Sequence, residues 1–135
     1  MDTQRRKDLP WGVLALAAVN VLYFLYLVLT GAVGSTLAMA EKGALLLVYG
    51  RYRGGLFPLI ASMFMHFDIH HLGGNLLMLL VVGDMLESRL GALRVLLIYL
   101  VTGLAGNGVS ILWYGWMGDT VVSAGASGAV YGMLG

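Results

Sequence analysis

The stretch that decides the fold is MFMHFDIHHLGGNLLMLLVVGDMLESRLG, residues 63–91. It begins with three histidines and an asparagine, continues as an apolar run, and ends in charged residues before a glycine. His71 and Asn75 are four positions apart and therefore share one face of a helix. The stretch predicts a membrane-spanning helix over residues 71–90 that carries polar side chains at one end and stops at Gly91.

The rest of the chain has the composition of a membrane protein. Of its 135 residues, 59% are hydrophobic and only 11% are charged, whereas about a quarter of the residues in a soluble domain are charged. The basic residues form no stripe that would follow a phosphate backbone, so nucleic acid is excluded as a partner. Cysteine is absent, which excludes disulfides, thiolate metal sites and cysteine nucleophiles.

Further apolar segments predict helices on both sides of the opening stretch. The first segment follows a basic start and exceeds the ~20 residues that a span needs. A secretory signal cleaved after AMA at 38–40 is the alternative, although its apolar core is usually only ~7–15 residues long. We predict an all-α fold class, a polytopic membrane helical bundle in a single domain over residues 1–135. Its segments are a cytoplasmic tail at 1–10, helices at 11–33, 71–90 and 93–115, loops at 34–70 and 116–125, and the start of a fourth helix at 126–135.

Basic residues predict the orientation of these helices. Residues 5–7 precede the first helix, and Arg89 and Arg94 flank the turn between the second and third. By the positive-inside rule both sites face the cytoplasm. The two loops are then extracytoplasmic, and the histidines lie on the same side as Ser127. We expect a multi-pass integral membrane protein of a bacterial inner membrane, with its N-terminus in the cytoplasm.

A second group of residues that could take part in a reaction lies in GASGAVYG, residues 125–132. A serine hydroxyl becomes a nucleophile only beside a base, and the oxyanion that it forms needs hydrogen-bond donors. Ser127 opens the expected fourth helix, whose first backbone N–H groups are free. The small residues Gly125 and Gly128 leave room for a substrate. His71 and Asn75 offer side-chain donors from the facing helix.

Each of these residues also has a simpler interpretation. Ser127 alone is typical of a turn or a helix cap, Asn75 of a hydrogen bond between helices, and Tyr131 of core packing. The three histidines with Asp68 are a candidate surface metal site. However, adjacent histidines on a helix point about 100° apart, and we expect no metal.

Together the two motifs resemble the rhomboid family of intramembrane serine proteases. They are His-xxxx-His-xxx-Asn in the second helix and Gly-x-Ser-Gly-xxx-Tyr at the start of the fourth, and the resemblance covers residues 60–135. It implies a rhomboid-like bundle of six core transmembrane helices, of which this chain holds four, the fourth truncated. It also implies hydrolysis of peptide bonds in or near transmembrane segments of membrane-protein substrates, without a cofactor. The expected partners are those substrates and the lipid bilayer.

The resemblance implies a role for each residue of the site. Ser127 would be the nucleophile, and His71, Asn75 and the Ser127 N–H would stabilise the oxyanion. The supporting and structural positions would be His66, Tyr131, Gly125, Gly128 and Glu87. The family's general base is a histidine on the sixth helix, which this chain does not contain. We therefore expect these residues to belong to a longer protein, and the 135-residue fragment alone to be almost inactive.

Two alternative functions remain open at this point. A rhomboid-like pseudoprotease would bind transmembrane clients without cleaving them. A channel or transporter would use the histidines as a polar pathway. The first loop also departs from the family pattern, because Phe57-Pro58 stands where an aromatic–Arg pair is usual.

Overall fold

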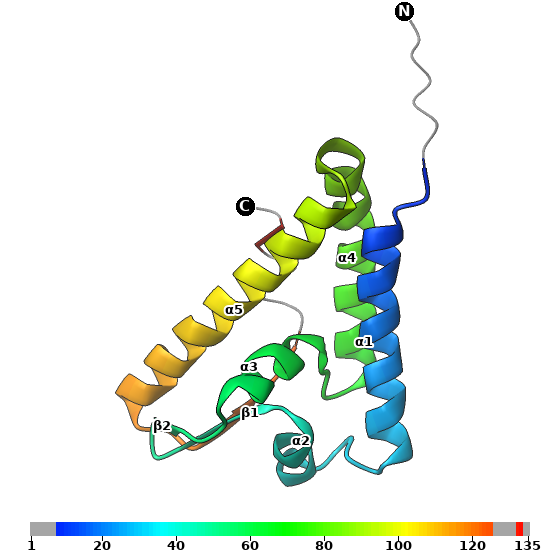
Figure 1. Cartoon of the computed structure of the whole chain (residues 1–135). Coiled ribbons are helices and arrows are strands. Elements are labelled where there is room, and N and C mark those ends of the chain that lie inside the picture. Colours follow the sequence, from blue (N-terminus) through cyan, green and yellow to red (C-terminus); the bar gives the residue numbers. More distant parts are fainter. Residues whose placement is uncertain (1–7, 126–131, 134–135) are drawn as a thin grey trace, which may run out of the picture.

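The structure, a computed structural model, describes residues 8–125 and 132–133. Three long helices dominate it (Figure 1): α1 (Trp11–Leu29), α4 (Ile69–Leu90) and α5 (Ala92–Met117). Each is long and apolar enough to cross a membrane. The shorter elements are α2 (Thr36–Lys42), β1 (Leu45–Val48), β2 (Arg51–Tyr52), α3 (Leu56–Ala61), the 3₁₀ turn η1 (Ser62–Phe64) and β3 (Val121–Ser123). The chain is therefore a mostly helical membrane protein.

Small residues bring α1 and α4 close together. A Cβ added at Gly83 would lie 2.7 Å from Cγ2 of Val13. One added at Gly12 would lie 3.1 Å from Oε2 of Glu87 in α4 and 2.9 Å from Cβ of Ala92 at the start of α5. Since real Cβ atoms do not approach so closely, both glycines are needed for this packing. The two helices accordingly lie side by side along most of their length (Figure 1).

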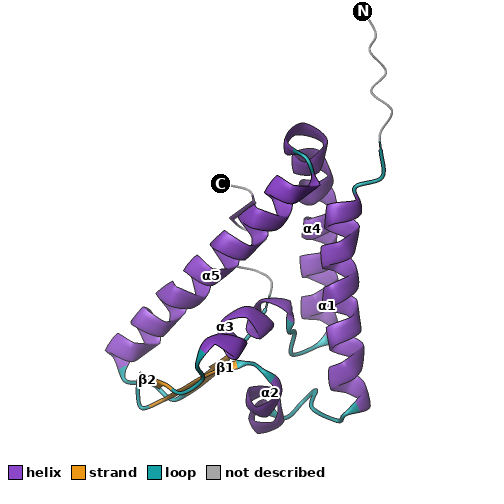
Figure 2. Cartoon of the chain, in the orientation of Figure 1, coloured by secondary structure: helices purple, strands orange, loops and turns teal. Residues whose placement is uncertain are grey.

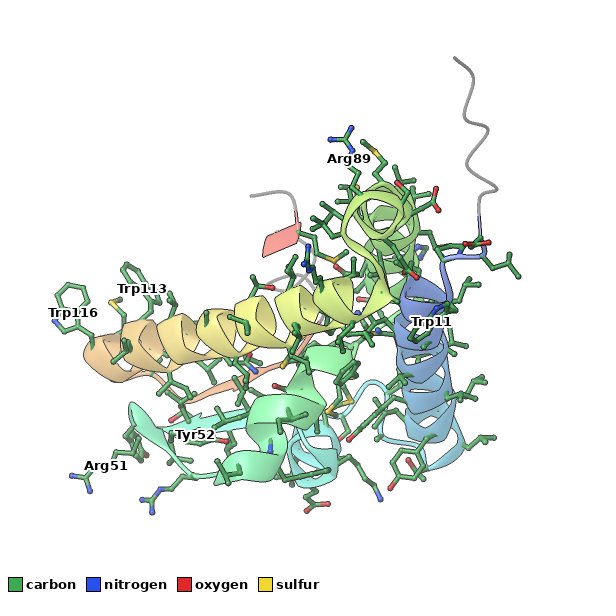
Figure 3. The ribbon with its side chains drawn as sticks, turned by 45° about the horizontal axis from the view of Figure 1, so that its top comes forward. Trp11, Arg51, Tyr52, Arg89, Trp113 and Trp116 are labelled. Atoms are coloured by element: carbon green, nitrogen blue, oxygen red, sulfur yellow. The ribbon has the colours of Figure 1, made fainter. Side chains whose placement is uncertain are left out.

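The helix α5 leans away from α1 and α4 (Figure 1). Its 26 residues span about 39 Å at 1.5 Å per residue, which exceeds the ~30 Å hydrocarbon core and favours a tilt. Trp113 and Trp116 lie at its far end, whereas Arg89 lies beside the α4–α5 turn at the other end (Figure 3). Aromatic residues at a helix end are typical of a membrane interface.

The core lies where the three long helices and η1 meet. Its buried members come from all of these elements and from Met133: Val13, Leu16, Met63, Leu79, Val95, Tyr99 and Met133. Two hydrogen bonds of buried side chains cross this core. Asn20 Nδ2 donates to Tyr99 Oη (3.3 Å), and Tyr99 Oη donates to the Met63 carbonyl (2.9 Å). These bonds attach the segment before α4 to the centre of the bundle.

A small antiparallel sheet corrects the expectation of an all-α fold. The strands pair in the order β2-β1-β3 and gather at one end of the molecule (Figure 2). Leu45 and Leu47 are buried while their neighbours are partly exposed, the alternation that a half-buried strand requires. Tyr49 and Gly50 both have positive φ, 48° and 74°, as in the tight turns that join two strands. The apolar run at 44–48 is too short to reveal this from sequence alone.

The sheet joins the loop after α1 to the loop after α5. In the register of β1 with β3, Leu45 faces Ser123 and Leu47 faces Val121. The Gly50 N–H also donates to the Asp119 carbonyl (2.8 Å), and the Tyr49 N–H donates to Thr120 Oγ1 (3.0 Å). The segment that leads to Ser127 is therefore held from residue 119 to residue 123.

Candidate active site

The site begins at the start of α4, which Asp68 caps. The Asp68 carboxylate accepts a hydrogen bond from the His71 N–H at 2.7 Å, the geometry of a helix N-cap. This bond is also the main reason why the pKa of Asp68 lies below its usual value. The cap explains why α4 starts at Ile69, two residues before the predicted start at 71. It also fixes the backbone that carries His71.

His66 and His71 form a pair in front of this helix. Their ring centroids are 5.1 Å apart and the ring planes meet at 72°, an edge-to-face contact. The His66 ring is fully buried, and neither of its nitrogens has a hydrogen-bond partner among the described residues. Burial, followed by the proximity of His71, lowers the pKa of His66 from 6.5 to about 4. His66 is therefore neutral at pH 7 and well placed to support the ring of His71.

Asn75 lies one helical turn beyond His71 on the same side of α4. Its Nδ2 donates to the His71 carbonyl at 3.1 Å, and the residue is partly exposed. A side-chain amide carries two N–H donors, so one remains available to a ligand. The sequence-based prediction that His71 and Asn75 share a face thus corresponds to a direct contact.

Gly125 connects the second motif to the first. Its N–H donates to the Ser62 carbonyl at 2.8 Å, and its φ of 136° favours glycine over other residues. Ser62 lies four residues before His66, so this bond brings the start of the serine motif to the loop that carries the histidine. Ser127, Gly128 and Tyr131 lie outside the described residues.

A polar cavity of about 130 Å³ borders this connection. It is lined by Gly103, Gly106, Asn107, Ser110, Ser123, Ala124 and Gly125. Asn107 Nδ2 donates to the Leu59 carbonyl (2.7 Å) and to Ser62 Oγ (3.0 Å). A polar cavity of this size is suited to water.

Sequence reasoning missed Ser62 and Asn107. An asparagine in the middle of an uncharged membrane span is costly unless it has a partner, and this signal alone would have marked Asn107. Ser62 gave no such signal, because its role depends on contacts with residues 45 and 63 positions away in sequence. Both residues hold the segment before α4 against α5.

Glu87 lies at the opposite end of α4, far along the chain from the histidines. Its Oε1 accepts from the Gly12 N–H (3.0 Å) and its Oε2 from the Val13 N–H (2.8 Å). These are two of the backbone donors that the first turn of α1 leaves free, and the positive end of the α1 dipole favours a carboxylate there. Glu87 therefore links α4 to α1.

Comparison with known proteins identifies the family. A model of the rhomboid domain matches residues 53–135. The rhomboid protease GluP of Bacillus subtilis is 35% identical over 121 residues, which are 87% of this chain and 22% of that protein. RHOMBOID-like protein 2 of Arabidopsis thaliana is 43% identical over 75 residues, 56% of this chain and 22% of the relative.

Another plant relative matches a larger share of the chain than RHOMBOID-like protein 2 does. RHOMBOID-like protein 1 of Arabidopsis thaliana is 31% identical over 101 residues, 75% of this chain and 25% of the relative. The chain thus spans about a quarter of the length of these relatives. No solved structure matches the chain. The match to the rhomboid domain covers more than half of the sequence, and the chain belongs to the rhomboid family.

Proposed function

We propose that the full-length protein is an intramembrane serine protease with Ser127 as its nucleophile. The observation that carries the proposal is the hydrogen bond that joins the start of the serine motif to the segment just before the histidine motif. Gly125, two residues before Ser127, is hydrogen-bonded to the loop that places His66 against His71. The same geometry supports the expectation that the serine motif and the face of His71 and Asn75 belong to one site.

The reaction follows from these residues. The Ser127 hydroxyl attacks the carbonyl of the scissile peptide bond and gives its proton to a histidine that lies downstream of this chain. The resulting oxyanion accepts hydrogen bonds from His71, Asn75 and the Ser127 N–H. The intermediate then collapses, the histidine protonates the leaving amine, and a water molecule hydrolyses the acyl-enzyme. The polar cavity beside Asn107 is a source of that water.

The substrates that we propose are transmembrane segments of other membrane proteins. The histidine pair lies at one end of the membrane-spanning helix α4, where a polar site and a bilayer-embedded peptide can meet. Glu87 places the start of α1 beside the α4–α5 turn, and the sequence is basic both just before α1 and at this turn. By the positive-inside rule that side is cytoplasmic, and the site opens on the other.

The test uses the full-length protein reconstituted in proteoliposomes with a labelled transmembrane substrate. We expect a fluorophosphonate to label the wild-type protein and Ser127→Ala to abolish both labelling and cleavage. Ser88→Ala is the matched control, because this serine is exposed near the other end of α4 and should remain dispensable. A folded protein that binds the substrate without labelling or cleavage would instead be a pseudoprotease. Cleavage that survives Ser127→Ala would refute the proposed nucleophile.

A further inference from the structure

An open groove of about 580 Å³ lies outside the candidate active site. Its lining comes from the C-terminal half of α1, the end of α2 and the start of α3. The lining residues are Val19, Leu22, Tyr23, Tyr26, Glu41, Lys42 and Phe57. None of them belongs to the proposed catalytic machinery. The apolar members Val19, Leu22 and Phe57 are 44%, 64% and 65% exposed, so the groove presents apolar surface at the side of a membrane-spanning helix.

The position of the Lys42 ammonium along α1 follows from its contact with Tyr26. The Lys42 Nζ lies 5.5 Å from the ring centroid of Tyr26, within reach of a cation–π contact. Tyr26 lies three residues before the end of α1 at Leu29, and therefore about 4.5 Å before it at 1.5 Å per residue. The Lys42 ammonium therefore lies towards the end of the candidate span, which is the end nearer to lipid phosphates. It has no carboxylate partner within ion-pair distance in the described part of the chain.

The floor of the groove is held in place by backbone contacts. Tyr23 Oη donates to the Lys42 carbonyl at 2.6 Å. A Cβ added to the next residue, Gly43, would lie 2.9 Å from Tyr23 Oη and 3.1 Å from Cε1 of Phe57. Gly43 also has a φ of 127°. The close approach that glycine permits here packs the end of α2 against α1 and α3, so the groove is a formed feature of the fold.

We propose that this groove binds one phospholipid, with its phosphate on Lys42 and an acyl chain along Val19, Leu22 and Phe57. The charge and the apolar surface suit a phospholipid, because Lys42 lies towards the end of the span while Val19 and Leu22 lie further inside it along α1. Phe57 of α3 adds apolar surface beside Gly43. An ordinary exposed lysine offers the same charge without the adjoining groove. This proposal does not depend on proteolysis. It adds a lipid-binding site, which membership of the rhomboid family does not by itself assign.

Glu41 makes the groove selective among headgroups. It also lines the groove and is exposed, so an acidic and a basic side chain both border the groove. A headgroup with both a phosphate and an ammonium, such as phosphatidylethanolamine, complements this pair. A headgroup with only a negative charge, such as phosphatidylglycerol, meets repulsion from Glu41.

Photolabelling of the full-length protein tests both parts of the proposal. The protein is reconstituted in phosphatidylcholine vesicles that contain a small fraction of phosphatidylethanolamine with a diazirine in its acyl chain. Parallel samples contain diazirine forms of phosphatidylglycerol or diacylglycerol. After irradiation, mass spectrometry of peptides locates the labels. Lys42→Gln is the test variant, since it keeps the backbone carbonyl that binds Tyr23. Arg51→Gln is its control, because Arg51 is an exposed cation of the same loop that does not line the groove.

We expect phosphatidylethanolamine to label Val19, Leu22 and Phe57. Lys42→Gln should reduce this labelling about fivefold, on the scale of one basic residue at a lipid surface, and Arg51→Gln should leave it unchanged. Glu41→Gln should remove the preference over phosphatidylglycerol. Equal labelling by diacylglycerol, or labels spread evenly over the exposed face of α1, would overturn the phosphate site. A preference for phosphatidylglycerol in the wild type would overturn the role of Glu41.

Discussion

Each end of α4 has a carboxylate that binds backbone N–H groups, but the two carboxylates have different roles. At one end Asp68 is exposed and its carboxylate caps α4 itself through the His71 N–H. At the other end Glu87 is buried and its carboxylate binds two N–H groups of a different helix, α1. The exposed cap is used within its own helix. The buried one uses both of its oxygens to hold the bundle together.

The difference extends to the groups around each carboxylate. Near Glu87 the short distances between Gly12, Ala92 and the carboxylate leave no space for a side chain on residue 12. Near Asp68 the buried His66 ring has two nitrogens without a described partner. Buried polar groups are normally paired, and an exception calls for a functional explanation. The end of α4 near Glu87 is therefore closely packed and its carboxylate is paired, whereas near the other end the His66 ring nitrogens have no partner among the described residues.

Removal of the buried carboxylate should have the largest effect on stability. Glu87→Ala loses two hydrogen bonds to a charged acceptor and leaves two N–H groups buried, which should lower the free energy of unfolding by about 4 kcal/mol. Glu87→Gln should cost about half as much, because only one amide oxygen can still accept. Unfolding of the protein in mixed micelles measures both. Arg89→Gln, in the last turn of the same helix and exposed, is the control. Equal stability of Glu87→Ala and Arg89→Gln would contradict the proposed contrast.

Much of this contrast could be read from the sequence, but not all of it. The helix that carries His71 and Asn75 was predictable because apolar length and i, i+4 spacing are local properties. The resemblance marked Glu87 as structural, yet its partners lie 74 and 75 positions away and no local pattern points to them. The sheet was missed for the same reason, since β1 owes its place to pairing with the distant strand β3.

Acid should weaken the protein through His66. Its pKa in the folded protein is about 4, below the usual 6.5, so the unfolded chain takes up a proton first as the pH falls. Stability should therefore decrease from about pH 6.5 down to pH 4, by up to about 3 kcal/mol at 1.4 kcal/mol per pKa unit. Thermal unfolding in detergent across this range measures the slope.

A pair of variants assigns that slope to the buried ring. His66→Gln removes the group that titrates and should flatten the profile between pH 6.5 and 4. His70→Gln serves as the control, because His70 is exposed at the start of α4 and its loss should leave the slope in place. An unchanged slope in His66→Gln would assign the acid sensitivity to another group.

Loss of Asn75 should affect the reaction more than the fold. Asn75→Ala removes a donor to the oxyanion, and kcat of the full-length protein should fall at least about tenfold. KM should change little, because the bond forms only in the transition state. The hydrogen bond to the His71 carbonyl lies within one helix and is partly exposed, so unfolding should shift little. A variant with unaltered kcat would remove Asn75 from the proposed oxyanion site.

The exposed cap should give a smaller effect on stability than the buried carboxylate. Asp68→Ala removes the acceptor of the His71 N–H and should lower stability by less than Glu87→Ala, whereas Asp68→Asn keeps an acceptor and should lie closer to the wild type. The pKa of Asp68 is lowered chiefly by this hydrogen bond. Its stabilisation is therefore present above the usual carboxyl pKa and disappears as the pH falls through the lowered value. Thermal unfolding at pH 7 and at pH 3 compares the variants. If Asp68→Ala were as damaging as Glu87→Ala, the two ends of α4 would be equally structural, and the contrast between them would not hold.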